Sequence, residues 1–322
     1  MKYAAKYWYI LALFVGAIGL MCQTEKIPGP PLKVGFLNVG YGDATLLITP
    51  GRHTILIDGG DAGQGANHIG PLLDELHINR LDYVILTNFN PEHLNGISEV
   101  LQPLGGMTAI NEAVYDPGGE GQADAFKRYV AAVGTKRRAM HLGQTIQVDG
   151  VRIACLAVNG LTESGTTFMA EQTRAVKPRG EDDRSLVLHV SHGDFDMVLG
   201  SDIHALNTRE FRDLETELAP VVHRVDVYRA NNHASVSSNS RNFLYALNPT
   251  VTIVSSGDNG RELTNPYSVR RILDTGSKVY LTNEVEGIRI KPRQGKAVNG
   301  DIWVRVFDDF YTVNKDTFRY RW

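Results

Sequence analysis

The sequence is poor in cysteine, in net charge and in long apolar runs. It has two cysteines, Cys22 and Cys155, among 322 residues, which excludes a small scaffold held together by several disulfides. Cys155 lies in an apolar, strand-like run and is predicted to be an inert core residue. The formal net charge is −3, so no global attraction draws the protein to nucleic acid or to an anionic membrane. A nucleic-acid substrate would need a local groove.

The one extended apolar run lies at the N-terminus, in residues 1–24. Two lysines precede residues 8–21, an uncharged stretch whose length is typical of the core of a signal peptide. The uncharged segment extends over residues 7–24, so an uncleaved membrane anchor is the alternative. Cys22 follows the apolar run and resembles the lipid-bearing cysteine of bacterial lipoproteins. We therefore expect export across a bacterial membrane, with membrane association through this segment.

The rest of the chain is interpreted as a proline-rich linker at residues 25–32 and one domain at residues 33–322. The domain opens with three short strand patterns separated by glycine-containing turns. Helical and strand patterns then alternate. Such an order predicts an α/β fold in which two packed sheets are covered by helices. The pattern includes helices at 69–76, 122–133 and 267–273, a hairpin at 141–158, and closing strands at 278–281, 287–290 and 302–307.

A polar loop, Asn88-Phe89-Asn90-Pro91-Glu92-His93, follows a predicted buried strand at residues 83–86. Other polar residues follow other predicted strands, namely Asp58, Asp202 and the segment 231–235. In α/β proteins sites gather at the ends of strands. Carboxylates and imidazoles that meet there suggest a divalent metal such as zinc or manganese.

Four segments in this order resemble the metallo-β-lactamase superfamily, and within it the hydrolase domain of the DNA-uptake competence protein ComEC and its stand-alone relatives. They are FLNVGYGDATLLITPGRHTILIDGG, LDYVILTNFNPEHLNGI, EDDRSLVLHVSHGDFDMVLGSD and RANNHAS. The resemblance covers about residues 33–307. It implies a four-layer αββα sandwich with a metal site along one edge of its sheets. It also implies hydrolysis that normally uses two metal ions.

The resemblance further implies a degenerate metal site. In the family's T-H-x-H-x-D-H-x-x-G loop, the two leading histidines correspond to Asn88 and Asn90. Carboxamides are poor zinc ligands, so the first metal ion is expected to be absent or very weakly held. The second ion retains a plausible set of ligands in Glu92, His93, Asp202 and His233, with Asp202 and His93 as the catalytic candidates.

Other polar residues are expected either to support the metal ligands or to be remnants of a lost metal site. Asp43 and Asp58 are expected to support the site or to shape turns rather than to bind metal. Asn88 and Asn90 are expected to hydrogen-bond where a metal ion would otherwise lie. In the late motif, Asn232 is the alternative to His233 as the counterpart of the family's histidine.

Two functions remain open. In the first, the protein is an exported member of the fold that has lost dinuclear hydrolysis and now binds or scaffolds an unknown partner, with no metal. In the second, it is a hydrolase with one zinc or manganese ion in the residual site, acting on a phosphodiester or another small molecule, as a nuclease-like enzyme would. The loss of two histidines favours the first, and metal analysis discriminates between them.

Overall fold

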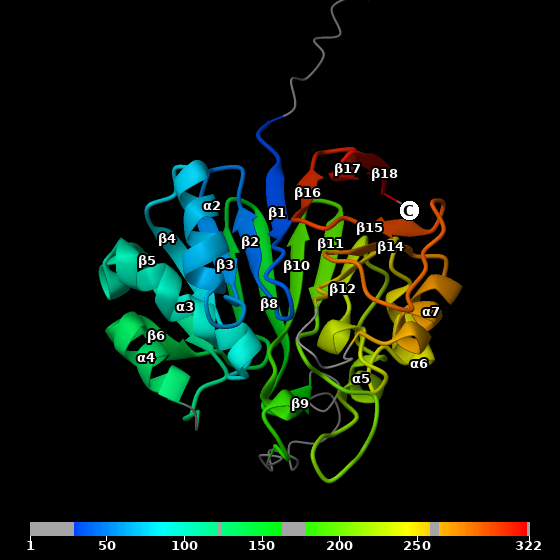
Figure 1. Ribbon diagram of the computed structural model, residues 1–322, viewed down its shortest axis with the longest axis horizontal. Helices are drawn as coiled ribbons and strands as arrows, with labels where there is room; N and C mark the ends of the chain where they lie inside the picture. Colours follow the sequence, from blue (N-terminus) through cyan, green and yellow to red (C-terminus); the bar gives the residue numbers. More distant parts are fainter. Residues whose placement is uncertain (1–28, 122–123, 163–177, 258–263, 321–322) are drawn as a thin grey trace, which may run out of the picture.

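The computed structural model describes residues 29–121, 124–162, 178–257 and 264–320 (Figure 1). The N-terminal segment with Cys22 and residues 163–177 lie outside the described residues. Within the described ranges, no helix is both long enough and apolar enough to cross a membrane.

The first half of the chain and its C-terminus together form one nine-stranded sheet. Its antiparallel part joins the N-terminal meander to the C-terminal strands, and its parallel part begins where β3 meets β4. In spatial order the strands are β18 (Asp316–Arg319), β17 (Phe310–Val313), β16 (Ile302–Val306), β1 (Leu32–Phe36), β2 (Thr45–Ile48), β3 (Thr54–Ile57), β4 (Leu81–Ile85), β5 (Ile110–Asp116) and β6 (Arg137–Ala139).

The second sheet follows the same plan, with antiparallel strands first and parallel strands from β11 onward. Its order is β15 (Gly295–Ala297), β14 (Lys278–Leu281), β13 (Val251–Val254), β12 (Val227–Arg229), β11 (Phe195–Leu199), β10 (Val187–His192), β8 (Val151–Val158) and β7 (Thr145–Val148), and β9 (Leu161–Thr162) pairs with β8. The hairpin predicted at residues 141–158 is confirmed as the β7–β8 pair.

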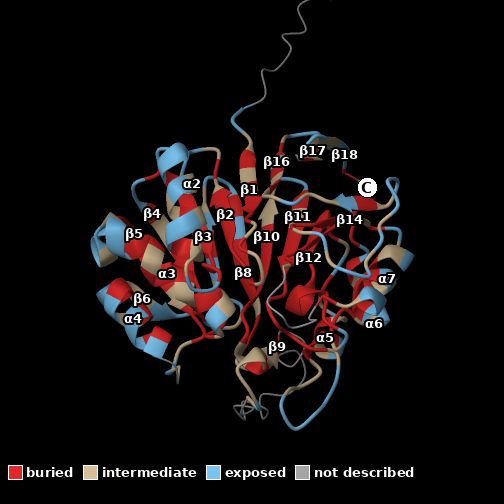
Figure 2. Cartoon of the chain, viewed as in Figure 1, coloured by how far each residue is buried: buried red, intermediate tan, exposed pale blue. Residues whose placement is uncertain are grey.

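Helices cover the outer face of each sheet. The apolar faces of α2 (Gly70–Glu75), α3 (Pro91–Leu104) and α4 (Asp124–Val133) pack on the first sheet. Those of α5 (Leu214–Leu218), α6 (Arg241–Leu247) and α7 (Pro266–Asp274) pack on the second. A third apolar cluster, contributed by both sheets, fills the space between them, and Figure 2 shows the buried strands at the centre of the molecule. The predicted four-layer αββα sandwich is confirmed.

One predicted strand is wrong. Residues 287–290 form no strand, and β14 pairs instead with β15 at Gly295–Ala297. The alternation of apolar residues that suggested a strand has another cause. Ile288 and Ile290 are half-buried and pack against the helix-side cluster of the second sheet, while Arg289 between them is exposed.

The start of α3 is held against the loop that follows β3. The Gly59 amide donates to the carbonyl of His93 (2.8 Å) and the Gly96 amide donates to the carbonyl of Gly60 (3.1 Å). The two backbones approach so closely that a Cβ on Gly96 would overlap the Gly59 carbonyl oxygen. This contact sets the position of His93 relative to Asp58.

The contact predicts that G96A destabilises the fold. The added methyl group meets backbone rather than a movable side chain, so we expect a loss of about 1–3 kcal/mol or more in the free energy of unfolding, measured by urea denaturation. The matched control is G300A, because a Cβ on Gly300 meets nothing within 4 Å. Equal stability of the two variants would contradict the prediction.

Candidate metal centre

Loops from both sheets meet at one edge of the sandwich. Asp58 follows β3, His93 lies in the first turn of α3 after β4, Asp202 follows β11, and His233 follows β12. Asp43 comes from the turn between β1 and β2. All five side chains are buried. The strand ends that the sequence singled out therefore converge, because parallel strands in both sheets end at this edge.

Four of these residues, Asp43, His93, Asp202 and His233, form what we term the buried ligand group. Each offers one ligand atom, and these atoms all lie within 4.8 Å of one another. His93 Nε2 lies 2.9 Å from Asp202 Oδ2, and His233 Nε2 lies 3.7 Å from Asp202 Oδ1. His233 Nδ1 lies 3.9 Å from Asp43 Oδ1. The spacing is that of side chains arranged around a common point.

Several atoms of the buried ligand group lack hydrogen bonds within the described part of the chain. They are His93 Nε2, Asp202 Oδ1 and both ring nitrogens of His233. His93 Nε2 is close to Asp202, but the contact is not in line with the ring N–H. Buried polar atoms without partners are costly, and two imidazoles with two carboxylates are a donor set that zinc and manganese accept. The residues present therefore fit one divalent ion.

Arg229 is the main cation of the site and is 1% exposed. Its Nη2 lies 3.0 Å from Asp43 Oδ2, and its Nη1 lies 3.8 Å from Asp58 Oδ2. Burial alone would raise the pKa of Asp43, but Arg229, with His233 and His93, lowers that pKa below its ordinary value. The guanidinium thus keeps this carboxylate charged although it is out of contact with water.

His93 lies between two carboxylates. Its Nδ1 contacts Asp58 Oδ2 at 3.0 Å, which orients the ring and directs Nε2 toward the rest of the group. Burial opposes the charged form of His93, but Asp202 and Asp58 outweigh it and raise the pKa of His93 well above its ordinary value. Burial likewise opposes ionisation of Asp202, yet His93, His233 and the Asn88 amide hold the pKa of this carboxyl well below its usual range.

The two asparagines of the polar loop act as hydrogen-bond donors to Asp202. Asn88 Nδ2 donates to Asp202 Oδ2 at 2.8 Å, and Asn90 Nδ2 contacts the same oxygen at 3.3 Å. Asn90 also donates to Asp182 Oδ1 at 2.8 Å. The Asn90 backbone amide donates to Asn88 Oδ1, which fixes the loop. Two neutral amides therefore contact the same oxygen of Asp202.

Glu92 lies at the rim of the site, half-buried, where its Oε1 accepts a hydrogen bond from the Tyr41 hydroxyl (3.3 Å). It is outside the buried ligand group, and its assignment as a ligand stays a prediction. Asp43, assigned by sequence to a supporting or remnant place, lies within the group instead.

The late motif has a strained backbone. Asn232, His233 and Ala234 have φ of 45°, 50° and 60°, in the left-handed region that non-glycine residues rarely adopt. The turn directs His233 into the buried ligand group, whereas Asn232 Nδ2 lies 3.3 Å from His204 Nε2. Both candidates for the late position thus border the site, and His233 presents the ligand atoms.

Sequence reasoning missed a chain of hydrogen-bonded side chains beside the group. His204 Nε2 contacts Asp182 Oδ2 and His204 Nδ1 contacts Ser237 Oγ, both at 2.8 Å. The His204 ring stacks on Phe211. These residues lie in irregular segments that carry no periodic signal. Arg229 was also missed, but a lone arginine in a strand with buried neighbours is a detectable sign of a buried cation.

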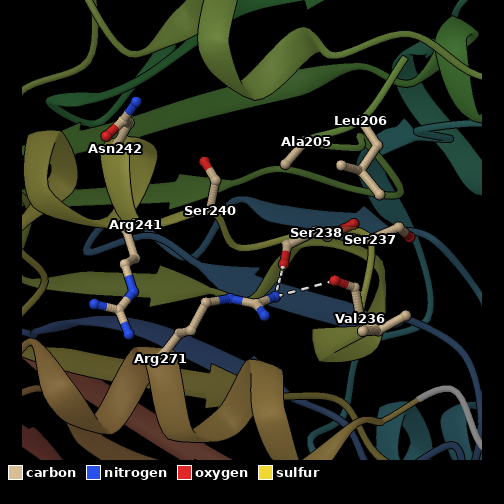
Figure 3. Close-up of a pocket in the computed structure, with 9 residues that line it drawn as sticks. All are labelled: Ala205, Leu206, Val236, Ser237, Ser238, Ser240, Arg241, Asn242 and Arg271. Atoms are coloured by element: carbon tan, nitrogen blue, oxygen red, sulfur yellow. Dashed lines mark hydrogen bonds between the residues drawn. The ribbon is translucent and has the colours of Figure 1, made fainter. Parts of the chain in front are cut away.

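Two hollows open beside the buried ligand group. The first has a volume of about 670 Å³ and carries Asp202 and His204 in its wall. The second has a volume of about 380 Å³ and is shown in Figure 3, with the side chains of Arg241 and Arg271 among its lining residues. Ser237 lines both hollows, so they adjoin. Acidic residues also line the first hollow, namely Asp61, Glu92 and Asp182.

Two nine-stranded sheets packed in four layers, with a histidine and aspartate group at one edge, are the architecture of the metallo-β-lactamase fold. No protein-family model matches the sequence. Among curated proteins, ComE operon protein 3 of Bacillus subtilis (strain 168) is 22% identical over 285 residues. The match covers 82% of this chain and 34% of the relative, so the chain spans about a third of that protein.

Solved structures with a similar fold are found as well. The metallo-β-lactamase fold protein YhfI from Bacillus subtilis is 12% identical, with a TM-score of 0.46, over 78% of this chain and 96% of that one. CmlA, a diiron β-hydroxylase from Streptomyces venezuelae, is 15% identical, with a TM-score of 0.42, over 80% of this chain and 45% of that one. The predicted resemblance to ComEC-like relatives of the metallo-β-lactamase fold is confirmed.

The buried position of Arg229 predicts that R229M destabilises the protein strongly. Removing the guanidinium takes the nearest cation away from the buried Asp43 carboxylate, whereas Asp58 keeps its contact with His93. We therefore expect a loss of about 3–5 kcal/mol in urea denaturation of the metal-free protein. The control is R270M, because the Arg270–Asp274 pair is exposed and is expected to contribute about 0–1 kcal/mol. If D43N added to R229M fails to restore any stability, the proposed ionic role of Arg229 is wrong.

Proposed function

We propose that this protein is a metal-dependent hydrolase in which one zinc or manganese ion takes the place of the family's pair. The observation that carries the proposal is the convergence of four buried ligand residues. Among their atoms, His93 Nε2, Asp202 Oδ1 and both ring nitrogens of His233 lack hydrogen bonds in the described structure. Asp43, His93, Asp202 and His233 would hold the ion. An ion bound there would supply Lewis acidity and lower the pKa of a water molecule in the hollow.

The chain's own residues divide the remaining tasks. Asp58 orients His93 through the 3.0 Å contact with Nδ1. Asn88 and Asn90 hold Asp202 from the other side, so its free oxygen Oδ1 faces His233. These contacts preorganise the donor set, which reduces the cost of assembling it around an ion. Asn88 and Asn90 are also poor metal ligands, so the proposal assigns one ion rather than two.

The two hollows indicate the substrate. Acidic residues line the first hollow, so a long polyanion is disfavoured there. The adjoining hollow carries two arginines (Figure 3). Burial and the neighbouring charge of Arg241 lower the pKa of Arg271, although Glu215 opposes the shift. Arg271 donates to the backbone carbonyls of Val236, Ser238 and Asn239, so the exposed guanidinium of Arg241 is the cation that an anion in this hollow would meet. We therefore propose a small phosphodiester or a related ester with one anionic group, rather than a long nucleic acid.

The alternative is a binding or scaffold protein without hydrolysis. It is favoured by the pairing of Asp43 with Arg229 and of Asp202 with His93, since these cations compensate the carboxylates without an ion. The activity of ComE operon protein 3 as a whole does not decide between these functions, because this chain spans about a third of that protein. Metal content and activity, measured together, separate the two functions.

Metal analysis of H93A tests the proposal. We expect the wild-type protein to retain an ion that H93A lacks, because His93 presents an otherwise unpaired nitrogen to the centre. D58N should weaken metal affinity or activity by roughly 10- to 100-fold, because Asp58 orients His93 without belonging to the buried ligand group itself. The measurements are bound metal after dialysis and hydrolysis of bis(p-nitrophenyl) phosphate with added zinc or manganese. The control is H141A, since His141 is exposed.

The outcomes are distinct. Loss of the ion and of hydrolysis in H93A, with both kept in H141A, supports the proposal. Equal metal content in wild type and H93A, with no hydrolysis by either, would establish the scaffold alternative. Hydrolysis that is unchanged in H93A would show that the chemistry lies elsewhere.

The arginine hollow predicts a separate effect on substrate binding. R241M should raise KM for an anionic substrate roughly tenfold, with kcat little changed, because a charge-assisted contact is lost away from the reacting atoms. Arg241 is exposed, so the fold should be unaffected. R289M, at another exposed arginine, is the control. An unchanged KM in R241M would exclude this hollow from substrate binding.

A further inference from the structure

A second group of metal-ligating side chains lies away from the buried ligand group. His189 on β10, Asp196 on β11 and His223, in the loop before β12, each offer one ligand atom, and these atoms lie within 4.8 Å of one another. In the β10–β11 pairing His189 is opposite Val198, and Ser191 is opposite Asp196. His189 and Asp196 are therefore diagonal neighbours on the same face of the sheet.

The second group lies at the opposite end of the strand from the first. Asp196 is near the start of β11, and Asp202 follows its end. The extended chain from Asp196 to Leu199 alone spans about 10 Å, which is more than the ligand shell of one ion can bridge, so one ion cannot serve both groups. A metal at the second group would be an independent site.

The contact between His189 and Asp196 leaves the imidazole unsatisfied. His189 Nε2 lies 2.8 Å from Asp196 Oδ1, but the oxygen is not in line with a ring N–H, and within the described chain this nitrogen makes no hydrogen bond. His189 is 9% exposed, so water has little access to it. The His223 ring is inclined at 68° to that of His189, with centroids 5.4 Å apart, so the two rings do not stack face to face.

The surroundings hold these side chains in place and leave room beside them. The Asp196 amide donates to Asp226 Oδ2 (3.1 Å), and the Asp226 amide donates to the Asp196 carbonyl (2.9 Å), which ties β11 to the start of β12. A hollow of about 180 Å³ is lined by both histidines and by Arg152. It gives access to the group from solvent.

We propose that His189, Asp196 and His223 bind a zinc ion whose fourth position is open to the hollow. Two imidazoles and one carboxylate are a donor set of zinc sites with three protein ligands and one exchangeable position. Arg152 beside it would favour an anionic fourth ligand, such as a carboxylate or phosphate. The ion would join β10, β11 and the loop before β12, so it should also raise the melting temperature.

Zinc stoichiometry tests the site. The tag-free full chain, in mild detergent, is dialysed to equilibrium against zinc, and bound metal is measured by mass spectrometry. We expect H223A to bind one ion fewer than wild type, and D196N to bind the same ion more weakly. H141A, at another exposed histidine, should match wild type. Because His223 is exposed, H223A should fold normally, which circular dichroism and melting in EDTA would check.

The outcomes separate this site from the buried ligand group. An ion that is lost in H223A but kept in H93A supports the second site, whether or not the buried ligand group also binds metal. A second test compares the absorption of bound cobalt in H93A and in the double variant H93A/H223A. An absorption band that is present in H93A and absent from the double variant would support the second site independently. Equal zinc content in wild type and H223A, or loss of both ions in H93A alone, would overturn it.

Discussion

Three buried aspartates, Asp43, Asp58 and Asp202, constrain this structure more than any other feature. Each carboxylate must be compensated where water does not reach it. Arg229 and His93 supply the positive charge, and the amides of the polar loop supply neutral donors. Because these partners come from both sheets, the charges can be balanced only when the sheets are packed together. The charge network of the candidate site thus also stabilises the packing of the two sheets against each other.

Backbone strain accompanies the charge network. Asp58, Ser201 and the turn at Asn232–Ala234 all have left-handed φ values, and none is glycine. Asp58 comes directly after β3, and Ser201 and Asn232 follow the ends of β11 and β12 by two and three residues, at the edge where the buried ligand group assembles. Such conformations persist only where their surroundings over-determine them, and they cluster at functional sites. These strained residues thus lie where the buried carboxylates and imidazoles meet.

Much of the fold could be predicted from local patterns. Helix α4, the β7–β8 hairpin and strand β4 follow from periodicity and turn residues that the packing does not override. The strand wrongly placed at residues 287–290 shows the limit. Alternating apolar residues can pack on a helical layer as well as pair in a sheet, and only the tertiary contacts distinguish these cases. The C-terminal strands β17 and β18 were not anticipated either.

By itself, the sequence determined the fold class, the loops that carry polar residues and the replacement of two histidines by Asn88 and Asn90. These are properties of residue identity and local spacing. Only the tertiary structure decided which side chains meet: it brought Asp43 into the ligand group, left Glu92 at the rim and placed Arg229 against the carboxylates. The physical reason is that side-chain direction at a strand end depends on the φ of a single turn residue and on the partner sheet, and neither is encoded in periodicity.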